Sequence, residues 1–189
     1  MDNYLMIERL KNAGISFEEG LSNAELALAE RVLGIRFPAE IRAFLACGLP
    51  VGGGFYNWRD LSATNIQRFR EFSLSIEDAF LFDIANDFDG LRAMFGDRFS
   101  EVTNQETFTE AVFNYLHQST KLIPFYAHRC FFDGMDHMPI VSFWQPTDTI
   151  FYGENFEDYL ETEFLGKQRC IKHPHDKMKD TGIWYYIIE

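Results

Sequence analysis

The sequence predicts a single α+β domain. Three observations favour this class: the chain has 189 residues, its N-terminal half carries apolar residues at helical spacing, and its C-terminal half contains short apolar segments joined by hairpin-length turns. A chain of this length corresponds to one domain and buries roughly 70% of the surface that its unfolded form exposes. With 47% hydrophobic residues and 20 phenylalanines, the chain has enough apolar side chains for a core.

Helices are expected first. The spacing of apolar residues predicts a short helix over residues 4–13. Ser22 and Glu25 form a capping box, in which a hydroxyl and a carboxylate each satisfy an unpaired amide at the start of the next helix. Gly34 suits the left-handed residue that ends this helix. Pro38 fits the first turn of a third helix, because its missing N–H costs nothing there.

The middle of the chain predicts three more helices, over residues 64–72, 76–86 and 108–117. The glycine run at 52–54, followed by aromatic residues, is interpreted as a turn that enters a short strand.

The C-terminal half turns to strands, expected over residues 122–128, 139–145 and 149–153. Pro124 indicates an edge strand or a strand start, because proline cannot donate to a sheet ladder. Residues 146–148 are a hairpin-length connection. The apolar run at 150–152 leaves neither face of its strand polar, which predicts layers packed on both sides of the sheet.

Asn155 is expected to cap a last helix with an apolar stripe. Glu163 falls within that stripe, so either the helix frays there or the carboxylate is paired in the core, with Arg129 as the candidate partner. We assign residues 1–166 to the domain and 167–189 to a C-terminal tail. Its apolar run at 183–188 is interpreted as a strand added to the sheet or as an exposed edge.

The formal net charge is −12, and the acidic residues are concentrated. Two stretches without lysine or arginine, between Arg70 and Arg92 and between Arg129 and Lys167, hold about half of the 29 acidic residues. Such a field repels nucleic acid and attracts cationic partners, so direct nucleic-acid binding is not expected. An ordinary solubilising surface is the alternative interpretation.

The cysteines are Cys47, Cys130 and Cys170, an odd number without a closely spaced pair, which does not fit a disulfide framework. The N-terminus lacks the basic start and apolar run of a signal peptide. An uncharged stretch near the middle, residues 43–56, is broken by glycines and too short to span a bilayer. A cytoplasmic protein without membrane contact is expected.

Little in the sequence indicates catalysis. Cys130 can be a nucleophile with His128 or His137 as its base, and His128 and Cys130 share a face if both lie on one strand. A structural cysteine is the alternative interpretation. The motifs of serine hydrolases, phosphate-binding loops, zinc proteases and dinucleotide-binding proteins are absent. We expect no enzyme and no cofactor.

A soft cluster of metal-ligand residue types lies in the tail: Cys170, His173 and His175. Three such side chains can hold zinc, but Pro174 stiffens the short span between them. A polar tail without metal is the preferred interpretation.

Two stretches together resemble a known family. The first contains Leu21-Ser22, Glu25, Leu33-Gly34-Ile35, Phe37-Pro38, Ile41 and Phe44-Leu45. The second contains Pro139-Ile140-Val141-Ser142-Phe143, the run from Asp148 to Gly153, the run from Phe156 to Leu160, and Glu163-Phe164, preceded by a similar strand at 122–129. They resemble the N- and C-terminal signatures of the SUKH superfamily, which includes a fungal cell-wall-synthesis regulator and bacterial toxin-immunity proteins. The match covers about residues 21–164, and the tail falls outside it.

The resemblance implies an α+β fold with helices around a mixed, largely antiparallel sheet. It also implies a non-enzymatic role, since bacterial members are thought to bind and neutralise a cognate toxin, often a nuclease. An acidic immunity protein suits a basic toxin domain, because charge complementarity raises the association rate. A regulatory scaffold that recruits a cellular enzyme is the first alternative, and a small cysteine-dependent hydrolase is the second.

The second base-free stretch coincides with the C-terminal signature, and the acidic strand–helix region within it, from Asp148 to Glu161, is therefore the predicted contact surface. Aromatic anchors at interfaces are often tryptophan, although most aromatic residues of this chain are expected in the core. The predicted partner-binding residues are Trp58, Asp60, Trp144, Asp148, Glu157, Asp158 and Glu161. The oligomeric state is left open.

Overall fold

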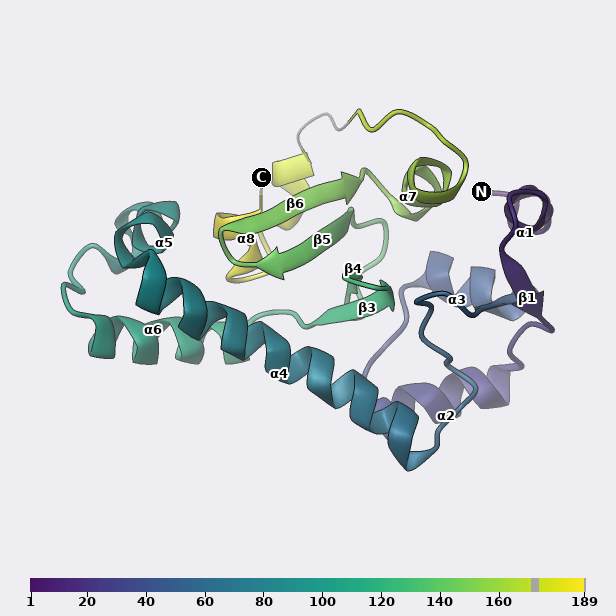
Figure 1. Cartoon of the computed structure of the whole chain (residues 1–189), viewed down its shortest axis with the longest axis horizontal. Helices are drawn as coiled ribbons and strands as arrows, with labels where there is room; N and C mark the ends of the chain where they lie inside the picture. Colours follow the sequence, from purple (N-terminus) through teal and green to yellow (C-terminus); the bar gives the residue numbers. More distant parts are fainter. Residues whose placement is uncertain (171–173, 189) are drawn as a thin grey trace.

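The computed structural model describes residues 1–170 and 174–188, and it confirms a single α+β domain. Helices dominate the first two thirds of the chain, and a sheet follows (Figure 1). The first part comprises α1 (Asn3–Asn12), β1 (Ser16–Glu18), α2 (Asn23–Leu33), α3 (Ala39–Cys47), β2 (Leu49–Val51), α4 (Ala63–Asn86), α5 (Phe88–Met94), the 3-10 turn η1 (Gly96–Phe99) and α6 (Gln105–Gln118). The second part comprises β3 (Leu122–Tyr126), β4 (Arg129–Phe132), β5 (Ile140–Gln145), β6 (Asp148–Gly153), α7 (Phe156–Phe164), the 3-10 turn η2 (Pro174–Met178) and α8 (Trp184–Ile187).

The main sheet is a four-stranded meander in the order β3-β4-β5-β6, and β1 pairs with β2 in a separate two-stranded sheet. Every strand pairing in the described ranges is antiparallel, so the mixed character that the resemblance implied is not observed. The segment expected as one strand over 122–128 is the first strand, β3, and the turn of a hairpin. The chain turns at Ala127, which has a positive φ of 48°, and returns as β4.

The local signals at helix ends are confirmed. The Ser22 hydroxyl accepts from the Glu25 amide at 3.2 Å, and the Glu25 carboxylate accepts from the Ser22 amide at 2.8 Å. Gly34 ends α2 in the left-handed region with φ 65°. The Asn155 side chain caps α7 by accepting from the Asp158 amide at 3.0 Å. Pro38 precedes the first turn of α3 as its N-cap residue, one position earlier than expected.

The two helices expected over 64–72 and 76–86 are one helix, α4, of 24 residues. Serines at 73 and 75 interrupt the apolar pattern, yet they do not break the helix. Their hydroxyls donate back to the carbonyls of Phe69 and Phe72, at 3.3 and 2.7 Å. Figure 1 shows that α4 runs between the two ends of the molecule. One end holds α1, α2 and α3, and the other holds α5 and α6.

The expected strand after the glycine run is not formed. Residues 49–51 before it are the strand β2, whereas Phe55 makes only an isolated bridge to Tyr126. The Phe55 ring packs in the core instead.

Both faces of the main sheet are buried, as predicted. Strand alternation sends Ile123 and Phe131 into a first core, which α1 to α3 and α7 cover. It sends Leu122, Phe132 and Phe143 into a second core, which α4, α5, α6 and the C-terminal tail cover. The sheet therefore holds two helical layers together.

The end of the tail, from Met178 to Ile188, contributes buried side chains to this second core. Residues 184–187 form the short helix α8, which corrects the expectation of an added strand. Trp184 is buried against Phe80 and Phe143, and its indole N–H donates to the Thr120 carbonyl. The apolar run at 183–188 therefore covers one face of the main sheet.

The predicted pairing of Glu163 is confirmed. The Arg129 guanidinium donates from Nε to the Glu163 carboxylate at 3.0 Å and from Nη1 to the Ser142 hydroxyl at 2.9 Å. It also lies 3.8 Å from the centre of the Tyr152 ring. Both charged side chains are mostly buried, so each compensates the desolvation of the other.

Replacing Trp184 tests whether the tail is part of the core. Trp184→Ala is expected to lower the free energy of unfolding by about 3–5 kcal/mol, because it leaves a large cavity in the second core. Its exposed neighbour provides the control, and Tyr185→Ala is expected to change that free energy by less than about 1 kcal/mol. Urea unfolding measures both. Equal effects of the two variants would contradict this packing.

The capping box predicts a pH dependence. The amide of Ser22, then the side chains of Arg59 and Ser22, lower the pKa of Glu25 from 4.5 to about 2. Since the pKa is lower in the folded state, the stabilisation is present above pH 4.5 and is lost as pH falls toward 2. Glu25→Gln should therefore be less stable than the wild type at pH 6, and the two should converge near pH 2. Thermal unfolding followed by circular dichroism at a series of pH values measures the difference.

Candidate functional site

The acidic residues of α7, predicted as a contact surface, are paired with cations of the same chain. Glu161 accepts from Arg9 at 2.8 Å and from Lys167 at 3.0 Å, and these bonds lower its pKa. Asp158 lies 2.7 Å from the Lys167 ammonium, and Glu157 lies 3.7 Å from the N-terminal amino group. These carboxylates fasten α7 to α1 and to the start of the tail, so much of their charge is compensated within the chain.

Two other acids of the second base-free stretch also bind groups of the same chain. Asp133 and Asp136 accept from the backbone amides of Arg36 and Ala39, at 2.5 and 2.6 Å. These bonds attach the loop after β4 to the entrance of α3. The sequence showed that this stretch is acidic, but it did not show that the tertiary fold uses the acids as caps and ion pairs.

The predicted contact residues outside α7 differ in how exposed their side chains are. Trp58 is in the first core with 1% of its surface exposed, so it offers no contact surface here, and Asp60 is exposed in the turn before α4. Trp144 is 67% exposed on β5, close to the β5–β6 hairpin where Asp148 is also exposed. The structure thus leaves Trp144 and Asp148 accessible together, apart from Trp58.

A stripe on the outer face of α4 exposes three large apolar side chains. Leu74, Leu81 and Phe82 are 55%, 46% and 57% exposed. They share one side of the helix with the exposed acids Glu71 and Asp78, since these positions recur at three- and four-residue intervals. We call these five residues the α4 stripe.

The acids of the first base-free stretch differ from those of α7 in their partners. Throughout residues 1–170 and 174–188, no lysine or arginine forms an ion pair with an acid between Arg70 and Arg92. The β5–β6 hairpin contacts α4 beside the stripe, where Thr147 donates its amide to Asp83 at 2.9 Å. Sequence reasoning missed this surface because it predicted two helices here and left Leu74 between them, so Leu74 and Leu81 did not fall on one helix face. The signal was present in the seven-residue spacing of Leu74 and Leu81.

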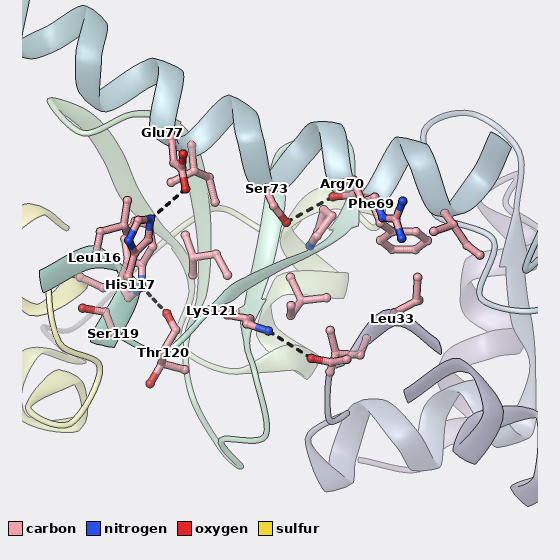
Figure 2. Close-up of a pocket in the computed structure, with 18 of the residues that line it drawn as sticks. Leu33, Phe69, Arg70, Ser73, Glu77, Leu116, His117, Ser119, Thr120 and Lys121 are labelled. Atoms are coloured by element: carbon pink, nitrogen blue, oxygen red, sulfur yellow. Dashed lines mark hydrogen bonds and ion pairs between the residues drawn. The ribbon is translucent and has the colours of Figure 1, made fainter. Parts of the chain in front are cut away.

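A groove of about 540 Å³ opens between the end of α2, one side of α4 and the start of β3 (Figure 2). Its lining combines apolar side chains of both cores with Arg31, Arg70 and Lys121. At one end, His117 and Glu77 lie 2.9 Å apart and connect α6 to α4. Sequence reasoning did not predict this groove, because its walls come from segments far apart in the chain.

The geometry around Cys130 does not form a thiolate site. Cys130 is fully buried in the second core, and this burial raises the pKa of its thiol well above the ordinary value. The His128 ring instead contacts exposed Trp144, and burial together with Arg129 lowers its pKa. His128 lies in the turn that precedes β4, whereas Cys130 lies within β4, so the two side chains do not share a strand face as expected.

The described residues contain no group of three or more histidine, cysteine and acidic side chains that could hold a metal ion. His173, part of the candidate cluster with Cys170 and His175, lies outside the described residues. Within the same ranges, no helix has the length and apolar character needed to cross a membrane.

Comparison of the chain with protein-family models, curated proteins and solved structures finds no match.

The cysteine environments predict a graded reactivity. Cys130 is expected to resist iodoacetamide in the native protein, because its thiol is buried and protonated. Cys170 is exposed and Cys47 is half-buried, so Cys170 should react first. Peptide mass spectrometry after timed alkylation, with a denatured sample as the control for full labelling, measures the order. Rapid native labelling of Cys130 would contradict its burial and reopen the nucleophile interpretation.

Proposed function

We propose that the protein is a non-enzymatic, SUKH-like binding domain that neutralises a cognate basic toxin domain, such as a nuclease, in the bacterial cytoplasm. We further propose that the α4 stripe is its main contact surface. The observation that carries the proposal is the coincidence of exposed Leu74, Leu81 and Phe82 with acids that have no cationic partner in the described ranges. Interfaces typically combine an apolar centre with a charged rim that steers the partner.

The α4 stripe replaces α7 as the leading candidate for an energetic reason. A partner that binds Asp158 or Glu161 has to compete with Lys167 and Arg9, which already hold these carboxylates at 2.7 to 3.0 Å. Asp78 has no such competitor among the described side chains. Exposed Trp144 and Asp148 lie on the adjoining hairpin, but strand alternation directs them away from Phe143 and α4, toward His128. They are therefore a separate candidate contact and not part of the α4 stripe.

Charge also favours a basic partner over a second copy of the chain. Two copies facing each other through the α4 stripe would bring Glu71 and Asp78 against their own equivalents, and like charges in an interface cost free energy. A surface rich in lysine and arginine with exposed apolar side chains complements both features of the stripe.

The first experiment is capture of the partner. Tagged full-length protein is purified from its own cells at low salt, eluted by a salt step and identified by mass spectrometry. We expect a basic domain that is toxic when produced alone and harmless when produced together with this chain. Recovery only of non-toxic housekeeping proteins would contradict neutralisation and favour the regulatory-scaffold alternative.

Variants then locate the contact. Asp78→Lys and Phe82→Ala are each expected to raise the Kd for the captured domain at least tenfold, about 1.4 kcal/mol, because one reverses the charge and the other removes the apolar centre. Glu8→Lys on α1 is the control, with the same charge change at an exposed position away from the stripe. Isothermal titration calorimetry measures the affinities, and thermal unfolding checks the fold. Unchanged affinity in folded stripe variants would refute this surface.

A further inference from the structure

The groove beside α4 differs from the rest of the molecule in its charge. The chain has 29 acidic and 17 basic residues, yet the groove is lined by Arg31, Arg70 and Lys121 and by one carboxylate, Glu77. That carboxylate lies 2.9 Å from the His117 ring. The groove is therefore a cationic site on an acidic protein.

Two of these cations lack partners. Among the residues that the structure describes, neither Arg31 nor Arg70 makes a hydrogen bond or an ion pair with its guanidinium, and both are exposed. The Lys121 ammonium donates to the Gly34 carbonyl at 3.2 Å, which holds it at the end of α2. A guanidinium has five donors and binds carboxylate or phosphate in a bidentate manner, so these groups are available to an anion.

The floor of the groove is apolar. It lies where the two cores meet, with Phe69 and Ile123 from the first core and Ile76 and Leu122 from the second. Trp184 also lines it. A cavity of about 540 Å³ is in the size range of small-molecule sites, which combine an apolar lining with a few polar groups that orient the ligand.

The charged and apolar parts are arranged along the groove. Figure 2 shows Arg70 and Leu33 toward one end, Glu77 and His117 at the other, and Lys121 between them. Arg31 is in the last turn of α2, close in sequence to Leu33. An anionic head group therefore fits at the α2 end, and an apolar body fits along the floor toward Ile76 and Trp184.

We propose that this groove binds a small amphipathic anion, with a carboxylate or phosphate head held by Arg31, Arg70 and Lys121 and an aliphatic body of medium length. An extended peptide fits less well. Although β3 is an edge strand, Pro124 has no N–H, and the edge beyond it is already covered because Ala127 donates to the Gly54 carbonyl at 3.0 Å. A continuous ladder for strand addition is thus missing.

Calorimetric titration of the full-length protein tests the ligand class. The probes are decanoate, decyl phosphate and decyltrimethylammonium below their micelle concentrations, and the peptide acetyl-Glu-Leu-Glu-Leu-amide. We expect one equivalent of a decyl anion to bind at least tenfold more tightly than the cation with the same tail, and the comparison of the two anions identifies the preferred head group. Equal binding of the cation, unsaturable binding, or binding of the peptide alone would overturn the proposal.

Variants test the location. The double variant Arg31→Gln, Arg70→Gln is expected to weaken binding of the preferred anion at least tenfold. The control, Lys11→Gln with Lys179→Gln, removes the same charge at exposed positions outside the groove lining. Ser73→Phe places a ring in the groove from α4 and should abolish binding with little change in thermal stability, because Ser73 is exposed. Full binding by the folded double variant and by Ser73→Phe would refute the site.

Discussion

Both faces of the four-stranded sheet are apolar, and the rest of the structure follows from the need to cover them. Alternation along β3 and β4 directs Ile123 and Phe131 to one side and Leu122 and Phe132 to the other. One layer of helices cannot cover both sides, so the chain supplies an N-terminal layer and a second layer built from its middle and its tail. The long helix α4 contributes to both cores and joins the layers, and the groove lies where they meet.

The acidic residues around α7 and those on α4 have different roles. Around α7, the buried Arg129–Glu163 pair connects the sheet to the helix, and Asp158 and Glu161 bind Lys167 and Arg9. Those acids hold elements together. On the outer face of α4 the acids have no such partners among the residues that the structure describes, and the same face exposes leucine and phenylalanine. Net charge alone does not distinguish the two situations. Whether an acid is paired depends on where the folded chain places its lysines and arginines.

A single helix therefore has two surfaces of opposite character. The α4 stripe is acidic and apolar, whereas the side that carries Arg70 and Ser73 lines a cationic groove. The two surfaces suit different ligands, a basic protein domain and a small amphipathic anion. They lie on different sides of one rigid element, so substitutions at one surface need not alter the shape of the other.

The sequence by itself determined features that depend on neighbouring residues: the capping box of α2, the Asn155 cap, the apolar helix stripes and a sheet buried on both faces. It also pointed to the Arg129–Glu163 pair, because a carboxylate within an apolar stripe requires a partner. Only the tertiary structure decided that the aromatic tail is helical, that Trp58 is buried, and which acids remain unpaired. The physical reason is that burial and ion pairing depend on contacts between residues far apart in the chain. Arg9 and Glu161, 152 positions apart, meet only after the layers pack.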